Sequence, residues 1–257
     1  MSLLELKELS KEFGGLKALQ RVSLAIDKGE VIGLVGPNGA GKTTLFNVLS
    51  GFYRPSGGSI IFKGEDVSHL KPYQLVKKGL TKTFQATSLF HEFSVAQNIA
   101  FGCQIRGDLG FFEEVLGFFS AKEKKRQIDQ KVEKILDLMD LFSVKDELAR
   151  NLPHGYQRSL GVAVALATDP ELLLLDEPFS GMNAQETSAM MEQIREIHKE
   201  KTLTVLLVEH DMRAVMELCE RIIVLNFGVK IAEGEPEKIQ KNPSVIEAYL
   251  GAYEDVA

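Results

Sequence analysis

A glycine-rich segment is the part of this sequence best suited to chemistry. It matches the spacing G-x-x-x-x-G-K-[ST], follows the apolar run Val31–Gly36 and precedes the helical pattern Lys42–Leu49. Such glycines let backbone N–H groups curl around phosphate oxygens, and the helix start adds its positive dipole end. We expect the Lys42 ammonium to reach the β- and γ-phosphates of a nucleotide and the Thr43 hydroxyl to bind Mg²⁺; the alternative is a plain glycine-rich turn. The expected nucleotide-binding residues are Gly36, Pro37, Asn38, Gly39, Ala40, Gly41, Lys42, Thr43 and Thr44.

A pair of carboxylates follows a second apolar run. The four leucines Leu172–Leu175 predict a buried central strand, and Asp176 and Glu177 come directly after it. The carboxyl end of a parallel strand is where such sheets present their ligands. Asp176 suits a Mg²⁺ site, directly or through water, and Glu177 can polarise an attacking water. The alternative is a solvated turn that closes the strand.

A histidine follows a third apolar run in the same way. Thr204–Val208 predicts another buried strand, and His210 stands just after its end. A neutral imidazole at that place can donate a hydrogen bond to a γ-phosphate or orient water. A lone histidine at a strand end is more often structural, but the phosphate loop and the carboxylate pair in the same sequence favour a catalytic role. The other histidines, at positions 69, 91, 154 and 198, are not in comparable places.

The elements that must hold these residues alternate between strands and helices. Short alternating strands near the N-terminus are followed by the phosphate-loop unit, and strands and helices alternate again after Gly155. This order predicts an α/β fold of the P-loop NTPase type, with a mostly parallel core sheet, an N-terminal antiparallel β subdomain and an inserted helical subdomain. We expect the core from residues 1–89 and 156–257, the helical subdomain at about 90–155, and a C-terminal helical tail at about 235–257.

Composition narrows the class of protein. The chain has 257 residues, with 30 Lys and Arg against 36 Asp and Glu, so its net charge of −6 argues against a protein that coats nucleic acid. No apolar run approaches the roughly 18–20 residues of a membrane helix, and the N-terminus lacks a signal-peptide core. The two cysteines, Cys103 and Cys219, fit no metal or redox spacing. We therefore expect a cytoplasmic location.

Together these motifs resemble the ATP-binding subunits of ABC transporters, over about Leu3–Gly251. The resemblance implies that Phe13 stacks on the adenine of ATP, unless it simply packs in the core. It also implies that Gln85 contacts Mg²⁺ and the attacking water and couples to a membrane partner, unless it is a solvated strand end. The segment Ser94–Ile99, SVAQNI, resembles the opening of the family's helical subdomain.

The signature segment departs from the family's usual L-S-G-G-Q. The chain has Leu152, Pro153, His154, Gly155 and Tyr156 there, so only the leucine and the glycine match. The resemblance implies that this segment binds the γ-phosphate of ATP on the opposite subunit. His154 or the exposed backbone is then a hypothetical substitute for the missing serine, and a weakened or asymmetric site is the alternative. Asn183 also stands where the family commonly has aspartate.

The phosphate loop, the signature segment and the tail EGEPEKIQKNPSVIEAYLG together resemble the importers of branched-chain, or high-affinity hydrophobic, amino acids. The relatives that energise urea uptake and lipopolysaccharide export share this tail and stay as alternatives. Other rivals are a P-loop kinase or GTPase, a non-transport ABC ATPase of DNA repair or translation, and a non-hydrolysing nucleotide sensor. The chain lacks the guanine motif N-K-x-D of GTPases.

The resemblance implies an ATPase with ATP and Mg²⁺ as cofactors, working as a head-to-tail dimer. The second subunit is either the same chain or a sister chain. The further partners are transmembrane permease subunits and, indirectly, a periplasmic or extracellular substrate-binding protein. The chain would then sit on the inner face of the cell membrane, held there by the permease.

Overall fold

The computed structural model of the chain describes residues 2–83, 89–105, 120–201 and 203–254. The chain folds into two compact units. The first unit comprises Met1–Lys82, Glu171–Pro178 and Ile197–Ala257, and the second comprises Thr83–Pro170 and Phe179–Glu196.

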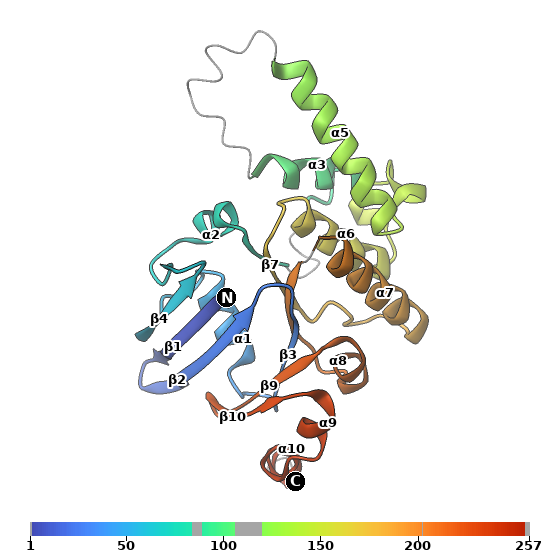
Figure 1. Ribbon diagram of the computed structural model, residues 1–257. Coiled ribbons are helices and arrows are strands. Elements are labelled where there is room, and N and C mark those ends of the chain that lie inside the picture. The colour runs from blue at the N-terminus through green and yellow to red at the C-terminus, as the bar shows by residue number, and fades with distance from the viewer. Residues whose placement is uncertain (1, 84–88, 106–119, 202, 255–257) are drawn as a thin grey trace. The chain divides into compact units, whose positions relative to one another are not determined.

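A six-stranded sheet forms the centre of the first unit (Figure 1). Its strand order is β10-β9-β3-β8-β7-β6, with parallel pairing throughout except for the β9–β10 hairpin. The middle strands are buried along almost their whole length, as expected when helices and a second sheet cover both faces of a parallel sheet. The strands are β3 (Val31–Val35), β6 (Leu80–Lys82), β7 (Leu172–Asp176), β8 (Thr204–Val208), β9 (Arg221–Asn226) and β10 (Val229–Gly234).

The N-terminal strands form a separate antiparallel sheet, β2-β1-β4-β5. Alternate leucines of β1 face the core, but the alternation shifts between Leu6 and Leu9, where the register also shifts. Glu8 adopts a left-handed backbone conformation at φ 50° inside this irregularity. The bulge explains how Leu4, Leu6 and Leu9 are all buried although their spacing is uneven. The strands are β1 (Ser2–Phe13), β2 (Leu16–Asp27), β4 (Gly57–Phe62) and β5 (Glu65–Asp66).

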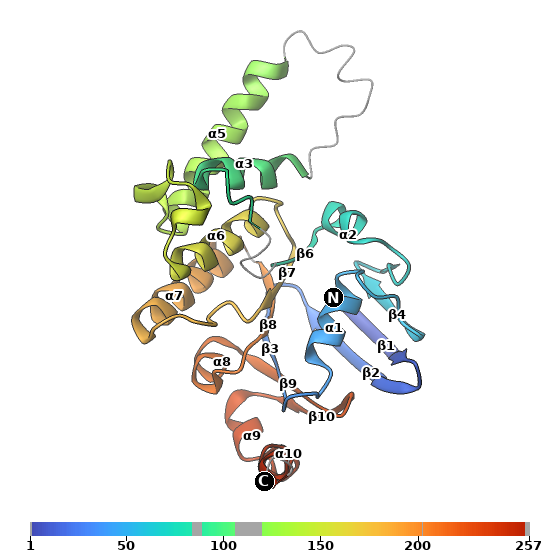
Figure 2. The same ribbon diagram turned by 180° about the vertical axis from the view of Figure 1, so that it is seen from behind.

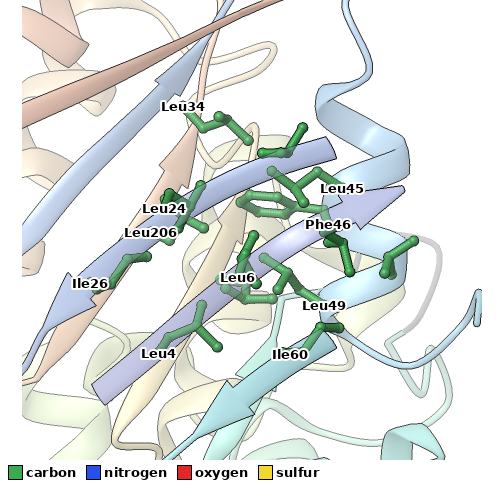
Figure 3. Close-up of a cluster of buried hydrophobic side chains, with 14 of the residues drawn as sticks. Leu4, Leu6, Leu24, Ile26, Leu34, Leu45, Phe46, Leu49, Ile60 and Leu206 are labelled. Atoms are coloured by element: carbon green, nitrogen blue, oxygen red, sulfur yellow. The ribbon is translucent and has the colours of Figure 1, made fainter. Parts of the chain in front are cut away.

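A hydrophobic cluster joins this sheet to the helix after the phosphate loop (Figure 3). Phe46 and Leu49 of α1 (Lys42–Leu49) point toward Leu4 and Leu6 of β1, and Phe46 is fully buried. Leu206 of the parallel sheet belongs to the same cluster. The helix that follows the phosphate loop is therefore held by apolar side chains from both sheets.

Five helices of the described residues, α1 among them, belong wholly to the first unit. α2 begins with a proline at its first position, where the missing N–H costs nothing. α8 is capped by Asp211, whose side chain accepts hydrogen bonds from the N–H groups of Arg213 and Ala214. No helix in the described part of the chain is both long and apolar enough to cross a membrane. The helices are α1 (Lys42–Leu49), α2 (Pro72–Lys78), α8 (Met212–Leu218), α9 (Pro236–Gln240) and α10 (Pro243–Glu254).

The second unit is helical, and its first helix is fixed as the SVAQNI segment predicts. Ser94 and Gln97 cap α3 reciprocally, at 3.2 and 2.8 Å. The side chain of Asn98 is buried and fixes the preceding loop. It makes hydrogen bonds to the backbone of Phe90, Phe93 and Ser94. The helices are α3 (Val95–Ile105), α5 (Ser120–Leu138), α6 (His154–Leu166) and most of α7 (Ala184–Lys201), with 3₁₀ turns at Phe142–Val144 and Ala149–Asn151.

We expect Phe46→Ala to lower the free energy of unfolding by about 3–5 kcal/mol, because it removes a fully buried ring from the cluster. Urea denaturation of the purified chain measures the change. The control is Leu16→Ala, whose side chain is 69% exposed and should change the value by about 0.5 kcal/mol or less. Equal losses in the two variants would show that α1 does not depend on this cluster.

Candidate functional site

Three neighbouring parallel strands bring most of the predicted site residues to one edge of the first unit. β3 and β7 both pair with β8, where Val208 lies opposite Leu34 on one side and Asp176 on the other. The phosphate loop leaves the carboxyl end of β3, and Glu177 and His210 follow the ends of β7 and β8. The sheet itself therefore gathers the phosphate loop, the carboxylates and the histidine, as the sequence predicts.

The phosphate loop has a backbone that only glycine accommodates at two places. Gly41 precedes α1 at φ 101°, and an added Cβ there would lie 2.7 Å from the carbonyl oxygen of Ala18. At Gly36 an added Cβ would lie 2.1 Å from the carbonyl oxygen of Leu225. The turn between β9 and β10 braces the loop, since the Gly228 N–H donates to the Ala40 carbonyl at 3.0 Å. The loop thus presents the free N–H groups of a helix start in a fixed curve.

Lys42 is held over this loop by the loop's own backbone. Its Nζ donates to the carbonyl oxygens of Gly36 at 2.6 Å and Pro37 at 3.0 Å, and the residue is only 6% exposed. Burial lowers the pKa of Lys42, and the charge of Glu177 opposes that shift by raising it. A cation this desolvated gains from a nearby anion, which is what a phosphate supplies.

Glu177 and His210 form a direct pair. His210 Nε2 lies 2.8 Å from Glu177 Oε1, and an ionised carboxylate can only accept, so the imidazole donates. Glu177 adopts a left-handed conformation at φ 49°, fixed by the hydrogen bond from its N–H to the Val208 carbonyl at 2.9 Å. Such a conformation is costly for a residue other than glycine and is typical of functional sites. The pair leaves the second carboxylate oxygen of Glu177 for another partner.

Two residues of this site carry no sequence signal. Lys82, at the end of β6, pairs with Asp176 at 3.0 Å, and both side chains are almost buried. Lys82 also donates to the side-chain oxygen of Asn47 on α1 at 3.0 Å. Lys82 stands before the expected Gln85, and its place in the sequence does not suggest a contact with Asp176. The structure therefore adds Lys82 as a partner of the Asp176 carboxylate and Asn47 as a partner of Lys82.

Phe13 lies at the end of β1 and is 40% exposed, so the alternative that it packs in the core is wrong. It makes an edge-to-face contact with Tyr53, with ring centroids 5.2 Å apart, and the Lys11 ammonium lies 4.7 Å from its centroid. An exposed ring held in this way can stack on a planar base. β2, the next strand, reaches the phosphate loop at Ala18.

The signature segment belongs to the second unit. Leu152 and Pro153 precede α6, which begins at His154, so Gly155 and Tyr156 lie in its first turn. His154 packs against Gly181, where an added Cβ would lie 2.8 Å from the ring, and Gly155 is backed in the same way by the Glu186 side chain. Gln85 lies outside the described residues.

The oxygen ligands at this edge fit a hard cation. Thr43 is exposed in the first turn of α1, and the Asp176 carboxylate lies at the end of β7. No group of three or more His, Cys, Asp or Glu side chains in the described part of the chain can hold a metal by itself. This combination suits Mg²⁺, which is usually held by one or two protein oxygens together with substrate phosphates and water.

Two family matches cover most of the chain. Residues 19–180 match the ABC transporter family. The matched stretch includes the phosphate loop, Asp176 and Glu177. Residues 229–255 match a family described as branched-chain amino acid ATP-binding cassette transporter. The second match covers β10, α9 and α10.

Similar proteins agree with these matches. The high-affinity branched-chain amino acid transport ATP-binding protein LivG of Escherichia coli (strain K12) is 39% identical, over 97% of this chain and 98% of LivG. The corresponding protein BraF of Pseudomonas aeruginosa is 37% identical, over 97% and 98% of the two chains. A crystal structure of the ADP conformation of an ATP-binding cassette of an ABC transporter superposes with a TM-score of 0.83, at 30% identity over 98% of this chain and 99% of that chain.

We expect Gly41→Ala to destabilise the nucleotide-free chain more than Gly39→Ala. Both glycines have positive φ, which costs alanine about 1–2 kcal/mol. At Gly39 an added Cβ meets nothing within 4 Å, whereas at Gly41 it overlaps the Ala18 carbonyl, which adds about 1–3 kcal/mol. Urea denaturation compares the two free energies of unfolding, and equal losses would refute the close approach of β2 to the loop.

Proposed function

Because the chain belongs to the ABC transporter family of ATP-binding proteins, we propose that it is the ATP-hydrolysing subunit of a branched-chain amino acid importer. The observation that carries the ATPase part is the Glu177–His210 pair, which follows the ends of β7 and β8. β8 lies between β7 and β3, and β3 is the strand that leads into the phosphate loop and Lys42. Support for the transported class comes from the LivG and BraF relatives and from the family match of residues 229–255.

The nucleotide would lie along the phosphate loop, with the N–H groups of residues 39–44 around its phosphates and Lys42 on the β- and γ-phosphates. Thr43 and Asp176 would hold Mg²⁺, together with Gln85, and Asp176 would act through water because Lys82 already pairs with it. Bound Mg²⁺ supplies neutralising charge to the phosphates. Phe13 would stack on the adenine.

Hydrolysis needs little covalent chemistry from the protein, since phosphoryl transfer depends mainly on positioning and electrostatics. The free carboxylate oxygen of Glu177 would accept a hydrogen bond from the attacking water and orient it in line with the γ-phosphate. His210 holds Glu177 from the other side at 2.8 Å, and its ring would move to the γ-phosphate when nucleotide binds. Lys42 would stabilise the charge that develops on the phosphate oxygens.

The active site would be completed by a second ATPase subunit in a head-to-tail dimer, either a copy of this chain or a sister chain. The signature segment, Leu152–Tyr156, would then face the γ-phosphate of the opposite subunit, with the start of α6 supplying N–H groups. Permease subunits would hold the pair at the cytoplasmic face of the membrane. A substrate-binding protein outside that membrane would deliver the amino acid to the permease.

We expect Glu177→Gln to bind ATP with nearly unchanged affinity but to hydrolyse it at least a hundredfold more slowly, because an amide cannot polarise water as a carboxylate does. Steady-state phosphate release and nucleotide titration measure the two quantities. Glu192→Gln is the control, since Glu192 makes only an exposed ion pair with Arg195 and should leave the rate unchanged. A normal rate in Glu177→Gln would remove this residue from the mechanism.

Uptake by cells tests the transported class. Deleting the gene from its source organism should abolish high-affinity uptake of labelled leucine, isoleucine and valine. The wild-type chain should restore uptake, and Glu177→Gln should not. Unchanged uptake of all three amino acids, with loss of another solute, would overturn the proposed substrate while leaving the ATPase intact.

A further inference from the structure

Lys82, the last residue of β6, is bonded to Asp176, the carboxylate that the proposed function assigns to Mg²⁺. β6 pairs in parallel with β7, and Lys82 lies opposite Leu174 in this pairing. Leu174 and Asp176 are two positions apart in β7, so their side chains lie on the same face of the sheet. The Lys82 side chain spans that step, and its Nζ lies 3.0 Å from Asp176 Oδ2.

A second hydrogen bond fixes the Lys82 ammonium from the helix that follows the phosphate loop. Lys82 Nζ donates to the side-chain oxygen of Asn47 on α1 at 3.0 Å, and it lies 5.9 Å from the centre of the Phe46 ring. α1 packs against β7, as the view from behind shows (Figure 2). The ammonium is therefore held in place by side chains of β7 and α1.

The ion pair is largely removed from water. The side chains of Lys82 and Asp176 are only 10% and 11% exposed. Two opposite charges attract each other more strongly in such a place than at the surface, because water screens them less. Lys82 therefore balances the charge of this carboxylate within the protein itself.

This balance changes what the site offers to a metal ion before nucleotide binds. A divalent cation that approaches Asp176 meets a carboxylate that is already paired, and the ammonium 3.0 Å away repels it. A bound nucleotide adds phosphate charge and phosphate oxygens, and Mg²⁺ is usually held by such phosphates together with one or two carboxylates. Metal binding at this edge would then depend on the phosphates.

We propose that Lys82 is a positioning residue that keeps divalent cations off Asp176 until nucleotide is bound. It acts through the Asp176 carboxylate and links metal occupancy to nucleotide occupancy. The inference rests on the proposed function, because it concerns the same Mg²⁺ site.

The test measures metal binding by the full chain without nucleotide, so it does not depend on hydrolysis. Mn²⁺ is the probe, because it takes the same oxygen ligands as Mg²⁺ and its electron paramagnetic resonance signal falls on binding. Lys82→Met keeps most of the side-chain length and removes the charge. Mildly alkaline pH keeps the Asp176 carboxylate ionised in this variant. It should then bind Mn²⁺ about tenfold or more tightly than the wild-type chain.

Further variants separate charge from shape. Lys82→Gln is also uncharged but can still hydrogen-bond to both Asp176 and Asn47, so it tests the inference even if Lys82→Met unfolds, and it should show the same gain. Lys82→Arg keeps the charge and should stay near the wild-type affinity. Lys78→Met is the matched control, since Lys78 makes an exposed ion pair with Glu65 and should also leave the affinity unchanged. Circular dichroism checks the fold of each variant.

A double-mutant cycle assigns the gain to Asp176. In an Asp176→Asn background, Lys82→Met should leave the Mn²⁺ affinity unchanged. A gain that persisted in this background would overturn the inference. So would a wild-type Mn²⁺ affinity in the folded, uncharged Lys82 variants.

Titration of the ADP-loaded chain with Mn²⁺ separates this inference from the proposed function. Asp176→Asn should weaken Mn²⁺ binding to the ADP-loaded chain. If it does so while the uncharged Lys82 variants match the wild-type chain without nucleotide, only the inference fails. If Asp176→Asn has no effect on the ADP-loaded chain, the proposed metal site fails together with the inference.

Discussion

The parallel pairing of β3, β8 and β7 is the constraint on which the rest of this structure depends. Hydrophobic burial fixes these strands in register, and Val208 stands between Leu34 and Asp176. Because parallel strands end at the same edge, one register brings the phosphate loop, a carboxylate pair and a histidine together. A slip of one residue would turn the buried side chains of a strand to its other face and separate these groups.

The site is held in a conformation that the local sequence disfavours. Glu177 at φ 49° and the glycines of the phosphate loop occupy backbone regions that most residues avoid. Hydrogen bonds from neighbouring segments fix them: Glu177 through the Val208 carbonyl, and the loop through Gly228 bonded to Ala40. The strain is therefore supported by the sheet and by the β9–β10 turn, which explains why the loop depends on residues almost two hundred positions away.

The sequence predicts those parts of the molecule that local pattern determines. The runs Val31–Val35 and Leu172–Leu175 are buried strands, and the phosphate loop enters a helix at Lys42 as its spacing requires. Contacts that depend on tertiary packing were not predictable in this way. The ion pair of Lys82 with Asp176 joins residues of neighbouring strands that are far apart in the chain. The bulge at Glu8 breaks the alternation of buried and exposed residues, so strict alternation from Leu6 does not predict that Leu9 is buried.

The charges at the sheet edge explain why this arrangement favours an anionic ligand. Asp176 is already balanced by Lys82, and the Glu177 carboxylate accepts from His210, so the two acidic groups are each engaged. Burial disfavours the charged form of Lys42, because desolvation lowers its pKa. Its ammonium donates to neutral backbone carbonyls. A phosphate on the loop would replace neutral carbonyl partners with a charged one and remove this penalty. Binding energy at Lys42 is therefore largest when the ligand carries negative charge, which is the property that a phosphate group has.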